Sequence, residues 1–591
     1  MRTYPHNFLA GLTLLLVLSS AVAAQSQPDE KATEVTRTGK ISGQVVNDAG
    51  QPLADALVSI RTYSFGAASR TRTTGSDGSF EVSGLEPVAY IISASLPGYV
   101  PAPRDPDVNP IGYYRVGDSV RVQMIKGGVI TGTITRSTDE PVVAVPVRAY
   151  MIRDSKGQPA RYGMPFQEKN TDDRGIYRIY GLAPGTYIVA AGGGTPWGYN
   201  VSAYGTDVPT YAPSSTPDTA GEIVVHSGEE IADVDIRYRG ELGHAVSGVV
   251  NSKLTADLPQ GYSITLVSTI NGASQPGYSS FQPPVGRGFS IYGVGDGDYD
   301  LMAQAFLPTG EWILSEPRRI KVRGADISGL ELTASSLGSI TGHIALEDSK
   351  APECKDKRRP LFGETLVTPW HNEKSAAKDQ PRFVWGLGAP TLPDKQGDFT
   401  LRNLASGQYR FSTRPMARYW YLKSISWQSS VGALPKATQE NRPADAARNW
   451  TTLKTGDRLS GLTITLAEGA ASLQGQIELA EGRTLPARMF VYLVPAEREK
   501  SNDVLRFFAA IISNDGTFEL TNLSPGRYRI VTQAVAENDS NILSKLRLPD
   551  EAEMRAKLLR DAEAAKLETE LKPCQNVRDY RVSLKPAVVG H

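Results

Sequence analysis

The chain has few of the residues on which disulfide-rich scaffolds and many active sites depend. Its 591 residues include two cysteines and six histidines. Two cysteines exclude a disulfide-dense scaffold and a four-cysteine zinc site. Lysine plus arginine (63) balances aspartate plus glutamate (63), so no overall basic field attracts nucleic acid or an acidic membrane. We therefore expect no nucleic-acid partner.

Long apolar segments are also scarce. The longest run, residues 8–17, is too short for a membrane helix, which needs about 20 apolar residues. Arg2 precedes the run and the small-x-small pattern Ala21-Val22-Ala23 follows it, which predicts a signal peptide at residues 1–23. We expect a flexible lead-in at 24–38, no transmembrane segment, and a secreted, periplasmic or cell-surface location.

What the chain does have is a fivefold internal repeat. At about 150 residues per domain the length predicts roughly four domains, but one pattern recurs five times. An aromatic residue that follows a turn starts each copy of the pattern, and a tyrosine stands ten residues later. The aromatic–tyrosine pairs are Phe80 and Tyr90, Tyr177 and Tyr187, Phe289 and Tyr299, Phe399 and Tyr409, and Phe518 and Tyr528.

The pattern predicts two strands joined by a tight corner. Apolar residues alternate after each aromatic and after each tyrosine, as they do in half-buried strands. The connections carry turn residues, for example Ala183-Pro184-Gly185 and Ser524-Pro525-Gly526. We expect each tyrosine to bury its ring and bond nearby backbone, as in the tyrosine corner of β-sandwiches.

Each copy also opens alike, with an apolar-x-Gly-x-apolar strand. The opening glycines are Gly43, Gly132, Gly248, Gly342 and Gly475. Such a glycine marks a bulge or a close backbone approach. A further recurring strand separates the copies. These spacings predict five β-sandwiches at 39–126, 127–241, 242–336, 337–469 and 470–591, which we call modules 1 to 5. Module 4 carries a long insert.

Together these motifs resemble the carboxypeptidase regulatory-like domain. The clearest copies run from Gly175 to Tyr187 and from Gly516 to Tyr528. The resemblance covers roughly residues 39–540 and implies a transthyretin-like β-sandwich, similar also to starch-binding-like modules, in an extracellular setting. It does not imply peptidase activity, because the domain is an appendage in carboxypeptidases. The third copy departs most, with Gly295-Asp296-Gly297-Asp298 in place of the Pro-Gly turn.

Motifs for catalysis are weak. His226 and Glu229 form a His-x-x-Glu pair, and His343 follows, but the equivalent loops of other copies are ordinary turns, so we predict no zinc site. Asp296, Asp298 and Asp300 alternate without the downstream glutamate of a calcium loop. No Gly-x-Ser-x-Gly elbow is present. We expect no catalytic residue, no metal site and no cofactor.

The glycine-rich run 191–194 lacks the Lys-Ser/Thr of a phosphate-binding loop. It is more typical of a flexible loop.

Aromatic residues give the strongest hint of a ligand. Five of the seven tryptophans fall within 370–450. Sugar rings stack on exposed aromatic faces, and such residues also anchor protein interfaces. Core packing is the alternative explanation. The candidate ligand surface consists of Trp385, Tyr419, Trp420 and Trp427.

Two further features involve the C-terminal segment. Cys354 and Cys574 are a candidate disulfide, because export favours oxidation; two unpaired thiols are the alternative. Residues 549–566 predict a helix with an apolar stripe that docks on the last sandwich.

The sequence therefore predicts an all-β protein, a tandem array of five antiparallel β-sandwich modules with a short C-terminal helix. We expect a non-catalytic binding or structural protein of the cell envelope or extracellular space, with a protein or a glycan as partner. Two alternatives stay open: a carbohydrate-binding protein, and an accessory or degenerate relative of a secreted carboxypeptidase.

Overall fold

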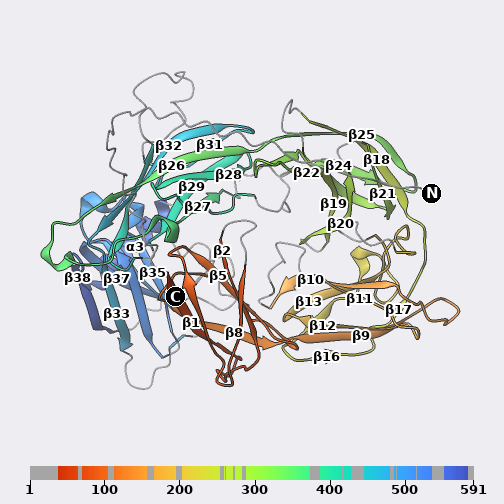
Figure 1. Cartoon of the computed structure of the whole chain (residues 1–591), viewed down its shortest axis with the longest axis horizontal. Coiled ribbons are helices and arrows are strands. Elements are labelled where there is room, and N and C mark those ends of the chain that lie inside the picture. Colours follow the sequence, from red (N-terminus) through yellow and green to blue (C-terminus); the bar gives the residue numbers. More distant parts are fainter. Residues whose placement is uncertain are drawn as a thin grey trace, which may run out of the picture. The chain divides into compact units, whose positions relative to one another are not determined.

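A computed structural model of the chain describes residues 38–63, 69–103, 112–155, 157, 166–194, 202–252, 259, 261–270, 273–282, 288–372, 387–415, 417–427, 445–478, 485–486, 489–513, 515–534 and 552–583. They lie within one compact unit, Thr38–His591. The predicted signal peptide and nearly all of the lead-in lie outside the described residues. The described part is built of strands with one α-helix, which confirms the all-β prediction (Figure 1).

Modules 1 and 2 each contain two sheets. In module 1 the strand orders are β4-β1-β8-β6 and β3-β2-β5-β7; in module 2 they are β12-β9-β16, with β17 also on β9, and β11-β10-β13-β14, with β15 also on β13. The elements are β1 (Gly39–Val46), β2 (Leu57–Thr62), β3 (Arg70–Thr73), β4 (Ser79–Leu85), β5 (Tyr90–Ser95), β6 (Tyr99–Pro101), β7 (Tyr113–Tyr114), β8 (Ser119–Lys126), β9 (Gly128–Thr135), β10 (Pro146–Asp154), β11 (Phe166–Asn170), β12 (Ile176–Leu182), β13 (Gly185–Ala191), β14 (Thr210–Tyr211), η1 (Pro217–Thr219), β15 (Ile223–Val225), β16 (Glu230–Ile231) and β17 (Ile236–Arg237).

Module 3 connects its strands into one sheet, whereas module 4 again has two. The orders are β20-β19-β22-β23-β25-β18-β21, with β24 also on β22, and then β28-β26-β32-β30 and β27-β29-β31. The elements are β18 (His244–Ser252), β19 (Tyr262–Ile270), β20 (Ala273–Gln282), β21 (Gly288–Val294), β22 (Gly297–Phe306), β23 (Trp312–Ser315), β24 (Arg318–Val322), β25 (Ile327–Ser336), β26 (Gly338–Glu347), η2 (Pro352–Cys354), η3 (Phe362–Glu364), β27 (Leu366–His371), β28 (Asp398–Leu404), β29 (Gly407–Arg414), β30 (Trp420–Trp427), β31 (Thr451–Leu453) and β32 (Arg458–Glu468).

Module 5 has sheets of order β36-β33-β39 and β35-β34-β37-β38. Its elements are β33 (Ala471–Glu478), β34 (Met489–Pro495), η4 (Arg498–Lys500), η5 (Val504–Arg506), β35 (Phe508–Ile512), β36 (Thr517–Leu523), β37 (Gly526–Ala534), α3 (Ala552–Ala565), β38 (Glu568–Leu571) and β39 (Asn576–Ser583). Leu558 and Ala562 of α3 pack on Phe490, Tyr492 and Val494 of β34. The C-terminal helix therefore docks on the last sandwich, as its apolar stripe predicted.

One pairing pattern recurs in every module. The opening strand pairs antiparallel with the strand of the repeat aromatic and parallel with the last strand of the module, as in β1 with β4 and β8. The same arrangement holds for β9, β18, β26 and β33. Most strand pairs are antiparallel, as predicted, and the pairing of each opening strand with the last strand of its module is a parallel exception. The recurring strand between copies returns to the sheet beside the opening strand and runs in the same direction.

The opening glycine lies opposite the repeat aromatic in every module. The pairs are Gly43 and Phe80, Gly132 and Tyr177, Gly248 and Phe289, Gly342 and Phe399, and Gly475 and Phe518. A Cβ added at Gly342 would lie 2.4 Å from the carbonyl oxygen of Leu462 and 2.5 Å from Cζ of Phe399. The glycine thus allows the aromatic ring and the parallel strand to approach it together.

A residue with left-handed backbone stands four places after each repeat aromatic. It is Gly84, Gly181 and Gly293 in modules 1 to 3, and Asn403 and Asn522 in modules 4 and 5. The amide of Asn522 donates to the carbonyl oxygens of Ala417 (2.9 Å) and Trp420 (2.7 Å). Asn403 accepts the backbone N–H of Trp312 (2.8 Å). Each asparagine therefore bonds the backbone of the preceding module.

Candidate functional site

The predicted ligand surface does not form around Trp420 and Trp427. Trp420 is 0% exposed and Trp427 is 7% exposed, and both belong to the core of module 4. A register shift between Leu422 and Ser424 in β30 changes which residues face inward, so both rings point into the core with Ile425. This prediction was wrong, because that face of β30 packs into the apolar core of module 4.

Tyr419, the third predicted residue, adds no fully exposed aromatic face. Tyr419 is half-buried, with Nζ of Lys357 4.9 Å from its ring centroid. Its carbonyl oxygen accepts the backbone N–H groups of Gly469 (2.8 Å) and Ala470 (2.9 Å). Trp385 lies outside the described residues. Tyr419 thus has a structural role where module 4 meets module 5.

A different tryptophan of module 4 is exposed. Trp370 on β27 is 47% exposed, although the sequence reasoning did not single it out. Strand alternation could have indicated this exposure. Val367 is buried, and the alternation of β27 places Trp370 on the opposite face of the strand.

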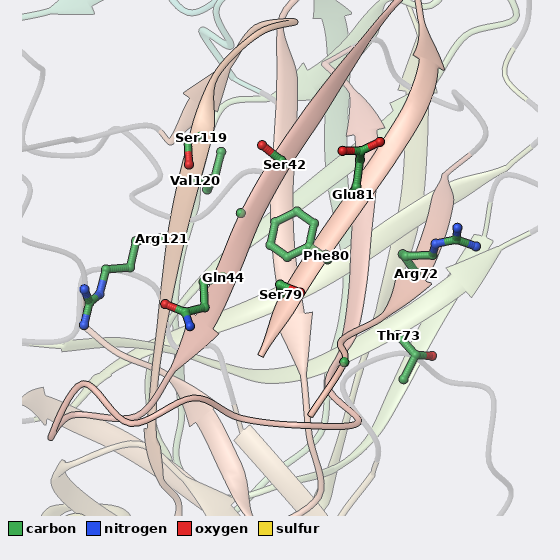
Figure 2. A pocket seen from close by; sticks show the side chains of 12 residues that line it. Ser42, Gln44, Arg72, Thr73, Ser79, Phe80, Glu81, Ser119, Val120 and Arg121 are labelled. Carbon is green, nitrogen blue, oxygen red and sulfur yellow. The ribbon is translucent and has the colours of Figure 1, made fainter. Parts of the chain in front are cut away.

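The polar hollow shown in Figure 2 lies on module 1. It is lined by Ser42, Gly43, Gln44, Arg72, Thr73, Gly75, Ser79, Phe80, Glu81, Ser119, Val120 and Arg121. Gln44 Nε2 donates to the carbonyl oxygen of Asp77 (2.7 Å), and Glu81 pairs with Lys40 (2.8 Å). The ring of Phe80 is 5% exposed. The hollow therefore offers hydrogen-bonding groups without an exposed aromatic face.

The histidines weighed for zinc have other contacts. The backbone N–H of His226 donates to Glu229 (2.9 Å), so this carboxylate caps a turn. Nδ1 of His343 lies 2.8 Å from Asp398. Within the described ranges, no three His, Cys, Asp or Glu side chains gather as a metal site would require.

The aspartates weighed for calcium do not converge. Asp296 accepts the backbone N–H of Gly324 (2.7 Å), and Asp298 pairs with Arg323 (2.9 Å). Asp300 accepts from Nη2 of Arg319 (2.9 Å). Each carboxylate thus has its own partner on or beside β24.

The glycine-rich run 191–194 is closely packed, so its interpretation as a flexible loop is wrong. The carbonyl oxygen of Gly192 accepts from Nη1 of Arg148 (2.8 Å), whose side chain is buried. A Cβ at Gly192 would lie 2.4 Å from the hydroxyl of Tyr238, and one at Gly193 would lie 2.5 Å from Pro209. These glycines allow the close packing of two adjacent segments.

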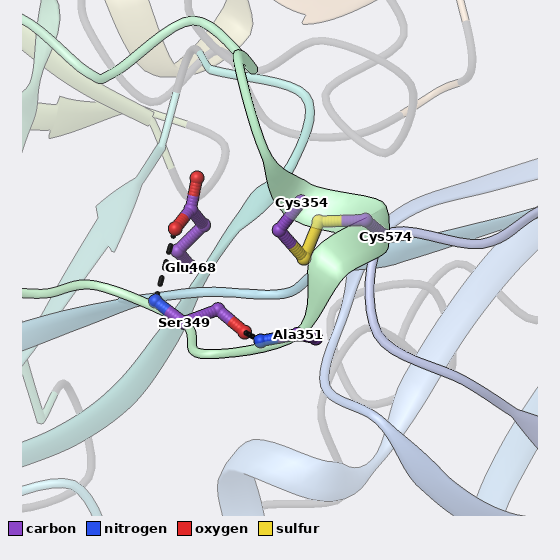
Figure 3. The surroundings of a disulfide bond; sticks show 5 residues. All are labelled: Ser349, Ala351, Cys354, Glu468 and Cys574. Carbon is purple, nitrogen blue, oxygen red and sulfur yellow. Dashed lines mark hydrogen bonds between the residues drawn. A yellow bond between two sulfur atoms is a disulfide. The ribbon is translucent and has the colours of Figure 1, made fainter.

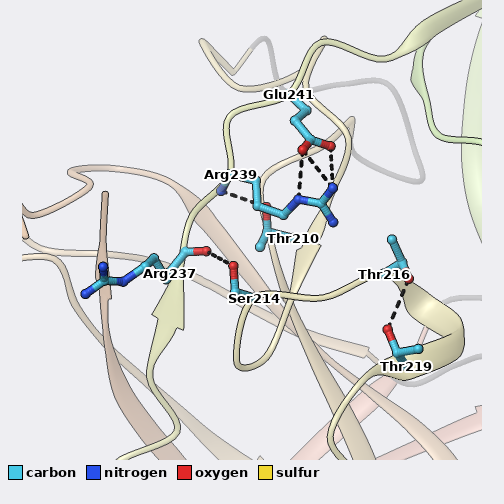
Figure 4. Close-up of polar contacts among 7 residues, drawn as sticks. All are labelled: Thr210, Ser214, Thr216, Thr219, Arg237, Arg239 and Glu241. Atoms are coloured by element: carbon cyan, nitrogen blue, oxygen red, sulfur yellow. Dashed lines mark hydrogen bonds and ion pairs between the residues drawn. The ribbon is translucent and has the colours of Figure 1, made fainter. Parts of the chain in front are cut away.

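The Pro-, Ser- and Thr-rich segment 209–220, which lengthens module 2, bonds the chain that leads out of this module (Figure 4). Arg239 donates its backbone N–H to Thr210 Oγ1 (3.2 Å), and its guanidinium pairs with Glu241 (2.7 Å). Ser214 Oγ donates to the carbonyl oxygen of Arg237 (2.8 Å). These contacts give the segment a structural role at the end of the module.

Figure 3 shows a disulfide bond between Cys354 of η2 and Cys574 in the turn between β38 and β39. Their Sγ atoms are 2.06 Å apart and their Cα atoms 5.3 Å apart, across 220 residues of sequence. Nearby, Ser349 donates its N–H to Glu468 (2.9 Å), and Cys574 donates its N–H to the carbonyl oxygen of Gly469 (3.0 Å). The bond links module 4 to module 5.

The fold defines the class as an all-β array of sandwich-like modules. The family model of the carboxypeptidase regulatory-like domain matches residues 40–118, which correspond to module 1. A search of the curated proteins found no match to the chain. The described residues contain no helix that is both long and apolar enough to cross a membrane.

Several solved structures are similar over part of the chain. The Bacillus anthracis TIE protein has 13% identity and a TM-score of 0.13, with 50% of this chain and 51% of that protein covered. The shaft pilin SpaA from Lactobacillus rhamnosus GG has 12% identity and a TM-score of 0.16, with coverage of 34% and 98%. BcpA, the major pilin subunit of Bacillus cereus, has 10% identity and a TM-score of 0.14, with coverage of 51% and 100%. The chain thus spans about half the length of the TIE protein, and TM-scores this low carry no functional argument.

Proposed function

We propose that the chain is an exported, non-catalytic protein of the cell envelope or extracellular space, whose modules act as a scaffold and as binding surfaces. The Cys354–Cys574 disulfide carries this proposal, because such bonds persist in oxidising compartments outside the cytosol. The repeated architecture supports it, since each module buries an apolar cluster of its own.

Expression of the whole chain in a bacterial host, followed by cell fractionation, tests the proposal. We expect an extracytoplasmic product that begins near Ala24 and holds both cysteines in a disulfide, as shown by mass spectrometry under non-reducing conditions. A variant without residues 1–23 is the control and should stay in the cytoplasm with free thiols. The same product should not hydrolyse a panel of peptides.

Two results would contradict the proposal. Retention of the whole chain in the cytoplasm would contradict its proposed export. Peptide hydrolysis that a metal chelator abolishes would favour the alternative of a secreted carboxypeptidase relative.

A further inference from the structure

The outer face of the sheet β27-β29-β31 carries a row of three large side chains across its strands. Trp370 of β27 is the register partner of Arg410 of β29. Tyr409 pairs with Thr451, so Trp450, directly before β31, continues the same row. Tyr409 is buried, which places its neighbour Arg410 in the outward phase. We call Trp370, Arg410 and Trp450 the tryptophan–arginine row.

Trp370 is exposed and yet held in place. Its indole Nε1–H donates to Oγ of Ser412 (2.6 Å) on the neighbouring strand. This bond fixes the ring while 47% of the residue stays open to solvent. A ring that is already oriented loses little conformational entropy when a ligand stacks on it.

Arg410 is held beside it by two further contacts. Its Cζ lies 4.3 Å from the ring centroid of Trp450, and Nη2 donates to the carbonyl oxygen of Arg448 (2.8 Å). The guanidinium is a planar group of five N–H donors. Its Nε–H is buried and its Nη2 is used in the bond to Arg448, so the positive charge of the group beside a stacking indole is what suits the oxygens of a sugar.

The side chains around the row are small and polar. Thr368 is in phase with Trp370, and Asn372 Nδ2 donates to Gln408 Oε1 (3.0 Å) at the other end. The three strands contain no aspartate or glutamate. Among the described side chains, the indole of Trp370 therefore lies beside the hydroxyl of Ser412 and across from the guanidinium of Arg410, which are groups that can bond sugar oxygens.

We propose that the tryptophan–arginine row binds a glycan chain, with one sugar ring stacked on Trp370 and its oxygens bonded by Arg410 and the polar groups beside it. Adjacent strands are about 4.8 Å apart, so the row extends about 10 Å from Trp370 to Trp450. A chain of at least two sugars is needed to reach across it. This inference rests on the proposed binding function and names the class of partner.

Affinity electrophoresis of the whole exported chain tests the site. The gels contain soluble starch, hydroxyethyl cellulose, polygalacturonate or alginate. Binding to neutral glycans (the first two) and to acidic glycans (the last two) is thus tested separately. We expect retardation in at least one gel, a loss of at least tenfold in apparent affinity for Trp370→Ala, and a smaller loss for Trp370→Phe, which keeps an aromatic face. Tyr292→Ala, at an exposed tyrosine of module 3 (57% exposed), is the matched control and should bind as the parent does.

Circular dichroism and thermal unfolding of each variant separate loss of binding from loss of fold. Retardation that Trp370→Ala leaves unchanged, or no retardation of the parent in any gel, would overturn the glycan site. So would capture of a protein partner that depends on Trp370 without any glycan binding. Each of these outcomes leaves export and the disulfide intact, so failure of this inference is distinct from failure of the proposed function.

Discussion

Each module closes one corner with a tyrosine whose hydroxyl donates to the carbonyl oxygen four residues earlier. The five distances lie between 2.8 and 3.0 Å, for Tyr90, Tyr187, Tyr299, Tyr409 and Tyr528. Burial raises the pKa of Tyr187 and Tyr409, and it raises the pKa of Tyr528 to about 12. A buried phenol with a carbonyl acceptor resists ionisation because the charged form loses water and its hydrogen bond.

This raised pKa predicts a loss of stability in alkaline solution. An unfolded tyrosine ionises near pH 10, whereas folded Tyr528 keeps its proton up to about pH 12. Between these values the native state binds more protons, so its stability falls as pH rises. We expect the corner tyrosines to ionise only with unfolding, seen as coincident changes in tyrosinate absorbance and circular dichroism. Ionisation of the corner tyrosines without any change in circular dichroism would disprove this account.

At the scale of the element, the two neighbouring strands limit the space for a side chain at the glycine of each opening strand. The repeat aromatic packs from the antiparallel neighbour and a carbonyl oxygen approaches from the parallel one. At Gly475 an added Cβ would lie 2.5 Å from Phe518 Cζ and 2.5 Å from the carbonyl oxygen of Tyr580. The equivalent contacts at Gly342 are as close, so no side chain fits without separation of the strands.

Gly342→Ala should therefore destabilise module 4 by at least about 1–3 kcal/mol, the usual cost of overpacking. Urea unfolding followed by tryptophan fluorescence measures this change, because Trp420 and Trp427 report on the same core. Gly221→Ala is the matched control, since its nearest neighbour would be 3.5 Å from the new Cβ. Equal unfolding midpoints for the two variants would refute the close-approach explanation.

At the scale of the whole molecule, the C-terminal modules are linked by more than the chain. The Cys354–Cys574 bond joins an insert of module 4 to the last turn of module 5, and Asn522 bonds the backbone at Ala417 and Trp420. A covalent link across 220 residues restricts the unfolded chain strongly. These contacts favour joint unfolding of the two modules.

Removal of the bond should separate their unfolding. We expect Cys354→Ser with Cys574→Ser to cost about 2–5 kcal/mol and to split or lower the thermal transition of modules 4 and 5. Differential scanning calorimetry with and without reductant gives the measurement. The double variant should be insensitive to reductant; a parent protein whose transition also ignores reductant would show that the bond adds no stability.

Much of the fold could be predicted because its signals are local. Alternation, the Pro-Gly corner and the ten-residue spacing from Phe399 to Tyr409 depend on strand pleat and turn geometry within a short stretch. The predicted bounds of the modules are consistent with the five core clusters and remain predictions. The candidate ligand surface failed at Trp420 and Trp427 because a tryptophan-rich segment has the same composition whether its rings face the core or the solvent.

The sequence by itself determined the repeat, the strand pairs, the corner tyrosines and the terminal helix, since each follows from neighbouring residues. Only the tertiary structure decided which tryptophans are buried, that each last strand returns parallel to the first, and that Arg410 lies between Trp370 and Trp450. The physical reason is that these outcomes depend on the register between strands far apart in the chain. A single shift, as at Leu422 and Ser424, turns side chains from one face of a sheet to the other.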